Sequence, residues 1–255
     1  MMDTLGAIIG PTTALVLLEV LHHHYRPLFA LTLLPGLLAA MMIAFVVPET
    51  ERKEVPHVSF GEHLRSLPAA YRQFVVAVGL FGLGAFAHTL LILLAAQKLT
   101  PVLGRTKAAS LAVALYVLHN IFYAGFAYVG GWLGDGLPKN RLLALGYSLA
   151  ALMCVGIIAL PVRVWTLALI FALGGINVAL EETLEDSLCA ELVNESQHGM
   201  AFGVLATVNG IGDFLSSVVV GALWTILGAT AAFGYSAALS VAGALLVLKL
   251  RPVTS

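Results

Sequence analysis

The sequence predicts an all-α, polytopic membrane protein with eight transmembrane helices. Two observations lead to this fold class. Of the 255 residues, 60% are hydrophobic and only 11% are charged, less than half of the roughly 25% charged residues of an ordinary soluble domain. The apolar residues also form runs long enough for spanning helices, each of which needs about 20 of them. These runs do not alternate with polar residues as the strands of a transmembrane barrel would.

Eight apolar runs are expected to cross the bilayer. Their approximate limits are 2–21, 27–47, 73–97, 108–133, 141–161, 164–185, 200–223 and 227–248. An even number of crossings puts both termini on one side of the membrane. With the termini inside, eight of the 13 Lys and Arg residues fall inside and five outside, and cytoplasmic loops carry the excess of these residues. We therefore expect a multi-pass plasma-membrane protein with both termini in the cytoplasm.

A charged linker separates the second and third runs. It covers residues 48–72 and divides the chain into a part with two runs, 1–47, and a part with six runs, 73–255. Within the linker, Ser59 and Glu62 have the spacing of a capping box, in which each side chain bonds the backbone amide of the other residue. This spacing favours a short interfacial helix on the cytoplasmic face. The alternative is an unstructured connector.

Small residues recur at helix-packing spacing in the first and seventh runs. The residues concerned are Asp3, Gly6, Gly10 and Pro11 in the first run, and Asn209, Gly212 and Asp213 in the seventh. Small residues four apart let two helices approach closely in lipid. If the first and seventh runs are equivalent, the repeat unit has six helices, and parallel repeats of this kind are one way in which transporters are built.

A short charged turn joins the fourth and fifth runs. It extends from Gly131 to Arg141 and contains Asp135 and Lys139. Two bases in a short loop favour the cytoplasmic side of the membrane. The stretch resembles the cytoplasmic loop motif of the major facilitator superfamily, Gly-x-x-x-Asp followed by a basic cluster. It also lies where that family repeats the motif, between the second and third helices after the central linker.

The first run adds to this resemblance. The stretch from Gly6 to Pro11 resembles the core of the Gly-x-x-x-Gly-Pro motif in the fifth helix of proton-driven antiporters. The resemblance covers the whole chain as helices five to twelve of a twelve-helix fold, without the first four helices. It implies a secondary active transporter of a small organic solute that is proton-coupled and works by alternating access. The alternative is an inactive fragment or a subunit, with a separate chain supplying the missing helices.

Asp213 is the strongest candidate for proton coupling. It lies near the middle of the seventh run, and an ionisable group at membrane depth is costly and functional by default. Asn209 lies four residues earlier on the same helical face. The structural alternative is an ion pair that only holds the bundle together. Asp3 has a comparable place in the first run, where we expect it to tie helix ends together at the cytoplasmic gate.

The sixth run ends in a dense group of acids. After Asn177 come Glu181, Glu182, Glu185 and Asp186. In the family, the corresponding tenth helix lines the substrate path. The resemblance therefore implies that Asn177 contacts the substrate and that Glu182 takes part in proton coupling or in a gate.

The placement of these acids predicts a basic partner, because acids near a helix C-terminus oppose its dipole. The nearest candidates by topology are Lys139 and Arg141 in the loop that begins at Gly131. We therefore expect Asp135, Lys139 and Arg141 to form a cytoplasmic gate with the acids of 181–186.

A further polar group lies near the middle of the third and fourth runs. It consists of His88, His119, Asn120 and Tyr123. Histidine titrates near neutrality and suits proton-linked transport, whereas a hydrogen bond between helices is the structural alternative. The polar and aromatic stripe on the fourth run could hold a sugar ring or an aromatic drug, or it could serve packing alone.

Other functional classes have little support. A net charge of −1 argues against a nucleic-acid partner. Neighbouring residues of a helix point about 100° apart, so His22-His23-His24 does not form a metal site, and no cofactor is expected. The sequence has no His-Glu-x-x-His, Gly-x-Ser-x-Gly or P-loop pattern, which makes an intramembrane enzyme the remotest alternative. The expected partners are the lipid bilayer, a small-molecule substrate and protons.

Overall fold

A computed structural model describes residues 2–21, 25–46, 66–161 and 163–250. All regular secondary structure in these ranges is helical. The elements are α1 (Met2–Val20), α2 (Tyr25–Val46), α4 (Ala69–Gly82), α5 (His88–Leu103), α6 (Arg105–Gly136), α7 (Lys139–Ala159), α8 (Val164–Leu192), the short 3-10 helix η1 (Glu195–Gln197), α9 (His198–Leu227) and α10 (Ala229–Leu248). Within the described residues, six helices are long and apolar enough to cross a membrane. The prediction of a polytopic helical membrane protein is confirmed.

The third predicted run is not one helix, and this part of the prediction was wrong. The chain leaves helical geometry after Gly82 and resumes it at His88, so that α4 and α5 together replace the expected helix at 73–97. Within the interruption, Gly84 packs closely against α10: a Cβ added there would lie 2.5 Å from the Cβ of Leu239. Apolar composition is continuous across this segment and gave no sign of the interruption.

Several other helices extend beyond the predicted runs. The helix α6 covers the predicted outer loop from Arg105 onward, and α8 continues to Leu192, two turns past the predicted end at 185. The turns between α5 and α6 and between α9 and α10 each consist of one glycine, Gly104 (φ 77°) and Gly228 (φ 89°). Positive φ at these turns is readily adopted only by glycine.

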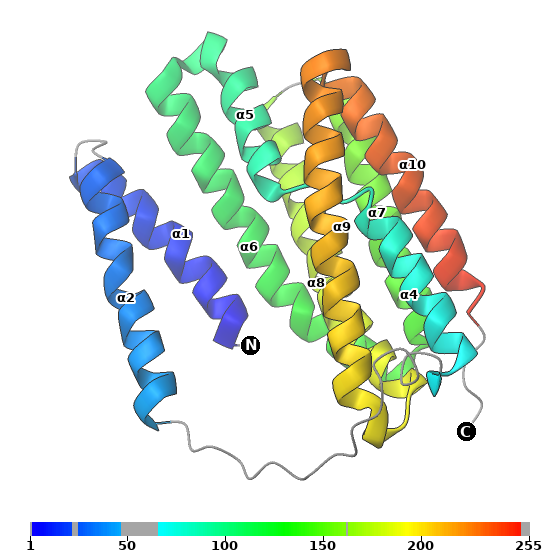
Figure 1. Cartoon of the computed structure of the whole chain (residues 1–255). Helices are drawn as coiled ribbons and strands as arrows, with labels where there is room; N and C mark the ends of the chain where they lie inside the picture. The colour runs from blue at the N-terminus through cyan, green and yellow to red at the C-terminus, as the bar shows by residue number, and fades with distance from the viewer. Residues whose placement is uncertain (1, 22–24, 47–65, 162, 251–255) are drawn as a thin grey trace.

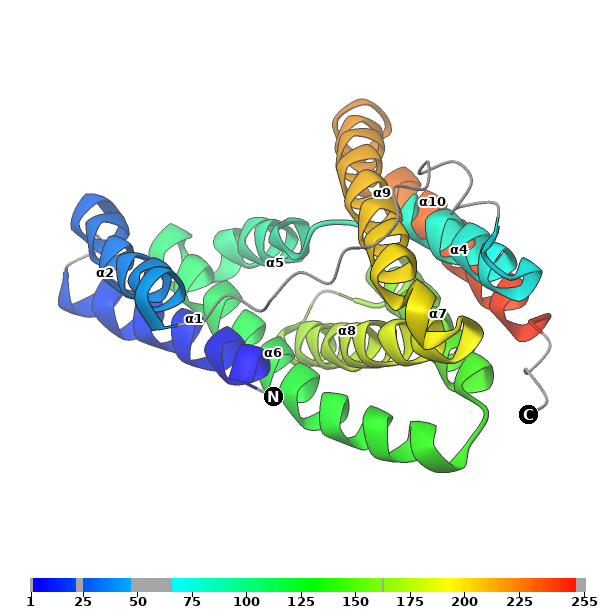
Figure 2. The same ribbon diagram turned by 60° about the horizontal axis from the view of Figure 1, so that its bottom comes forward.

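The helices from α4 onward form one bundle, and α1 and α2 lie at its side (Figure 1). In the bundle, α8 packs against α6 and α7, and α10 packs against α7, α4 and α9. The helix α5 packs against α6, which also contacts α1, while α2 packs against α1. Figure 2 shows the N-terminal pair beside α6, away from α7 and α10.

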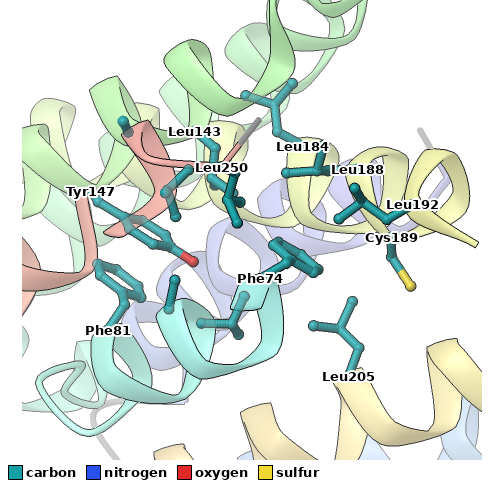
Figure 3. Close-up of a cluster of buried hydrophobic side chains, with 14 of the residues drawn as sticks. Phe74, Phe81, Leu143, Tyr147, Leu184, Leu188, Cys189, Leu192, Leu205 and Leu250 are labelled. Carbon is teal, nitrogen blue, oxygen red and sulfur yellow. The ribbon is translucent and has the colours of Figure 1, made fainter. Parts of the chain in front are cut away.

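Two clusters of buried apolar side chains hold the bundle together. One joins α4, α7, α8, α9 and α10, and part of it is drawn in Figure 3. At its centre the rings of Phe81 and Tyr147 stack with centroids 3.7 Å apart and an interplanar angle of 4°. The second cluster joins α5, α6, α7, α8 and α10 around Phe171 and Phe233. Burial of apolar side chains from many helices fixes how the polar residues between them are placed.

Of the glycines predicted to lie at close helix contacts, Gly212 does so, but Gly6 and Gly10 do not. A Cβ added at Gly212 would lie 3.2 Å from the Cα of Gly82, so α9 and α4 approach closely there as the spacing predicts. Gly6 and Gly10 would meet nothing within 4 Å, so in this structure they make no close packing contact. Pro11 lies within α1 as a continuous helix.

Some predictions fall outside the described residues. These are the capping box of Ser59 and Glu62, the linker up to residue 65, the side chain of Asp3, and His22-His23-His24. The last part of the predicted linker is helical, because α4 already begins at Ala69.

Candidate functional site

A cavity of about 490 Å³ lies among the helices of the bundle. Its size falls in the range of about 300 to 1,000 Å³ that small-molecule sites occupy. It is bounded by the interruption between α4 and α5 and by α5 to α10. The lining residues are Phe81, Gly84, Ala85, Phe86, Ala87, His88, Thr89, Ile92, Tyr116, Ala150, Met153, Cys154, Asn177, Val178, Glu181, Glu182, Asp213, Ser217 and Ser240.

Five residues predicted from three separate runs meet in this cavity. They are His88 from α5, Asn177, Glu181 and Glu182 from α8, and Asp213 from α9. Asn177 and Asp213 lie close to the midpoints of their helices, so the cavity lies near the middle of α8 and α9. The exposed side chain of Asp213 faces this space.

Asn177 is held by the neighbouring helix. Its Nδ2 donates to the backbone oxygen of Gly146 on α7 at 3.1 Å. The contact is possible because α7 and α8 approach closely: a Cβ added at Gly146 would lie 3.0 Å from the Cβ of Leu180. The buried amide of Asn177 therefore has a fixed position at the cavity wall.

Glu182 is tied to α6. The hydroxyl of Tyr123 donates to Oε2 of Glu182, and Tyr123 does not itself line the cavity. The predicted polar stripe on α6 thus reaches the cavity through this bond. Asn120, by contrast, donates to the backbone oxygen of Tyr116 in its own helix at 3.0 Å and is buried.

The two histidines form a pair that joins α5 to α6. Their ring centroids are 4.7 Å apart. His88 faces the cavity, whereas His119 is 3% exposed and lies behind it, with Nδ1 3.1 Å from the backbone oxygen of Phe171 on α8. This contact joins α6 to α8, as a hydrogen bond between helices would.

Glu185 is buried between α8, α7 and α9. It is 2% exposed. The hydroxyl of Tyr147 on α7 donates to its Oε1, and Nδ2 of Asn209 on α9 donates to its Oε2 at 3.0 Å. Both donors are neutral. The sequence analysis did not predict a role for Tyr147. The only sequence feature that could have indicated one is a polar phenol within the apolar run that forms α7.

The structure shows a partner for Lys139 that differs from those of the predicted gate. Lys139 forms a salt bridge with Glu191, a residue that the prediction did not include, and not with the acids of 181–186. The reason is the length of α8: its last two turns bring Glu191 to the level of the loop, and Glu185 lies about 9 Å further along the helix at 1.5 Å per residue.

Three other members of the predicted gate lie at the surface. Asp135, Arg141 and Asp186 are exposed, and no hydrogen bond or salt bridge ties their side chains to another described residue. Gly131 and Gly134 of the same motif pack against α8, since Cβ atoms added there would lie 3.7 Å from Thr183 and 3.1 Å from Leu184. In the described part of the chain, no group of three His, Cys, Asp or Glu residues is placed to hold a metal ion.

Comparison with known proteins gives two results. The model of a family described as "Major Facilitator Superfamily" matches residues 1–162 and 103–255, which together cover the whole chain. The chain is also 29% identical over 246 residues to an uncharacterized MFS-type transporter of Methanocaldococcus jannaschii. This alignment covers 96% of the chain and 61% of the relative, so the chain spans less than two thirds of the length of that protein.

Proposed function

The chain belongs to the major facilitator superfamily, and on this basis we propose that it moves a small organic solute across a membrane by alternating access. Membership of this family indicates a membrane-embedded transporter and not an enzyme. The supporting observation is the cavity of about 490 Å³ near the middle of α8 and α9, where polar side chains from α5, α8 and α9 meet. Non-helical backbone at membrane depth is tolerated where it lines a cavity, and the interruption between α4 and α5 lines this one.

The membrane and orientation are part of the same proposal. We place the protein in the plasma membrane with both termini in the cytoplasm, because Lys and Arg residues are more frequent in loops on that side. The turn with Lys139 and Arg141 then lies on the cytoplasmic face, and the glycine turns at Gly104 and Gly228 lie on the outer face.

We further propose that transport is coupled to protons through Glu185. Its two donors, Tyr147 and Asn209, are neutral, and no described Lys or Arg forms a salt bridge with it. A buried carboxylate without a cation is costly when charged. Movement of α7 or α9 that removes one donor raises this cost, which favours proton uptake from the cavity side.

The groups around Glu185 provide a route for that proton. On its own helix, Glu181 and Glu182 lie four and three residues earlier and line the cavity, while Asp186 and Cys189 lie toward the helix end. From α7 the facing group is Tyr147, and from α9 it is Asp213 near Glu181. Glu181 and Glu182 therefore connect Glu185 to the solute cavity, where Asp213 is a second proton acceptor.

A second candidate function is a subunit that transports only together with additional helices. The open faces of the N-terminal pair favour it. Gly6 and Gly10 have helix-packing spacing but nothing within 4 Å, and α2 exposes large apolar side chains along its whole length. In this case the purified chain, of 26.8 kDa, would be inactive alone and active when co-reconstituted with the chain that covers these faces.

Flux in liposomes tests these proposals. The purified full chain is reconstituted around a trapped pH-sensitive dye, and a panel of organic cations, sugars, amino acids and carboxylates is added one solute at a time. We expect at least one solute to change the luminal pH in a protein-dependent way. If no solute does so and none accumulates in the vesicles, the chain alone is not a transporter.

Glu185→Gln tests the coupling residue. It should abolish uptake driven by a pH gradient while leaving exchange of labelled for unlabelled solute, because exchange needs no net proton movement. Glu191→Gln, an acid of the same helix outside the cavity, is the matched control and should behave as wild type. Full pH-driven uptake by Glu185→Gln would remove Glu185 from the coupling role.

A further inference from the structure

We propose that the cavity is selective for an organic cation with an apolar body. This inference rests on the proposed transport function and names the class of solute. It follows from the charges that line the cavity, from the groups that remain free to bind a ligand, and from the aromatic rings around them.

The charges of the cavity wall are of one sign. Three carboxylates line it, from Glu181, Glu182 and Asp213, and its lining contains neither Lys nor Arg. The one salt bridge among the described residues, between Lys139 and Glu191, lies outside it. Carboxylates in a low-dielectric cleft attract cations and repel anions, and a cationic solute supplies the counter-charge that the bundle itself does not.

Two of these carboxylates have no partner in the described protein. Glu182 accepts from Tyr123. Glu181 receives no hydrogen bond from any described side chain, although it lies in a partly buried position near Glu185 and Asp213. The side chain of Asp213 is exposed toward the cavity and likewise receives none. Because they come from α8 and α9, Glu181 and Asp213 can bind one ligand from two helices.

Three aromatic rings contribute to the cavity wall. Phe81, Phe86 and Tyr116 line the cavity. Each is fixed by another ring: Phe81 stacks on Tyr147, Phe86 meets Phe233 edge-on at 5.1 Å, and Tyr116 stacks near His119 at 5.7 Å. Aromatic faces attract organic cations, and the attraction is larger when water is excluded.

This combination distinguishes the ligand from other classes. A small metal ion would need several ligands around one point, and no described group of three His, Cys, Asp or Glu residues provides them. An anion would meet three carboxylates and no fixed cation. An ammonium or phosphonium ion with a bulky apolar body satisfies both the acids and the rings, and the volume of about 490 Å³ accommodates it.

Equilibrium binding to the purified full chain in detergent tests this inference without any transport. The probe is radiolabelled tetraphenylphosphonium, with protein-free micelles as the background. Tetraphenylborate, an anion of the same shape, is measured separately as a second radiolabelled probe, because the two ions form a poorly soluble salt when mixed. We expect saturable binding of the cation and no saturable binding of the anion above empty micelles. Equal saturable binding of the anion, or no saturable binding of the cation, would overturn the inference, and neither outcome depends on a variant that must fold.

Variants then locate the site. Glu181→Gln and Asp213→Asn should each weaken binding of tetraphenylphosphonium at least tenfold, equivalent to about 1.4 kcal/mol, while Glu191→Gln leaves it unchanged. Unaltered affinity in both cavity variants would place the cation elsewhere. The outcome is separable from that of the flux experiment. Flux of a neutral or anionic solute without cation binding would contradict this inference alone, and cation binding without flux of any solute would contradict transport alone.

Discussion

Two acids of α8, Glu185 and Glu191, have the same side chain on the same helix but different environments. Glu185 is 2% exposed and accepts from Tyr147 and Asn209 of two other helices. The side chain of Glu191 is 54% exposed and pairs with Lys139 at the end of the helix. The first is a buried acid held by neutral donors, which makes its charge costly, and the second is a surface ion pair, which contributes little to stability.

The comparison extends to the helix around each acid. Near the middle of α8, Gly174 and Gly175 bring its backbone against α6, and the polar contacts of Asn177 follow. At the end of α8 the charged side chains reach solvent. A change in the inner segment should therefore affect folding and transport together, whereas a change at the end should affect neither strongly.

The largest effect is expected from a side chain at Gly175. A Cβ there would lie 2.2 Å from the backbone oxygen of His119 and 3.0 Å from the Cβ of Phe122, so Gly175→Leu must separate α6 from α8. Overpacking of this kind costs about 3 kcal/mol or more. We expect no monodisperse peak in size-exclusion chromatography. Gly125→Leu on α6 is the control, because Gly125 has open space around it, and equal behaviour of the two variants would contradict the tight contact.

The second prediction compares the two acids directly. Glu185→Ala leaves the Tyr147 hydroxyl and the Asn209 amide as donors without an acceptor, at about 1 to 3 kcal/mol for each buried group. Glu191→Ala removes a surface ion pair worth about 0 to 1 kcal/mol. In mixed detergent and SDS micelles, the decrease in the free energy of unfolding should therefore be several-fold larger for Glu185→Ala than for Glu191→Ala. Equal losses would show that the burial of Glu185 has no energetic consequence.

The positions of most helices, and of the polar residues within them, could be predicted from hydropathy. Continuous apolar runs located most helices, and polar residues inside them located His88, Asn177 and Asp213, which line one cavity. Their positions could be predicted because polar residues in a span must face a cavity or a partner.

What the sequence could not predict depends on contacts between helices. Tyr147 is one aromatic residue among many in apolar runs, and nothing in the sequence pairs it with Glu185. The extra turns of α8 placed Glu191, and not Glu185, beside Lys139. In the interruption after Gly82, Gly84 packs against Leu239 of α10. Each of these is set by packing between distant segments, which composition and spacing do not contain.

A smaller effect is expected when only one donor of the inner acid is removed. Tyr147→Phe deletes the hydroxyl that donates to Glu185 but keeps the ring stacked on Phe81. The loss of one hydrogen bond to an acid should cost about 1.5 kcal/mol in the free energy of unfolding. Phe81 and the ring of residue 147 should keep their packing, so the variant should remain monodisperse. Tyr71→Phe, which removes a bond from a phenol to the backbone oxygen of Ala201, measures the cost of a lost phenol bond without an acid.

The smallest effect belongs to the ion pair at the end of α8. A double-mutant cycle of Lys139→Ala and Glu191→Ala should give a coupling free energy of about 0.2 to 1 kcal/mol in low salt. Because Glu191 is largely exposed, raising the ionic strength to 1 M, where the Debye length is about 3 Å, should remove most of this coupling. A coupling of several kcal/mol that persists in high salt would mean that the pair is desolvated in the membrane-embedded protein. Glu185 and Glu191 would then both be shielded from water, and they would differ only in the charge of their partners, which are neutral for Glu185 and cationic for Glu191.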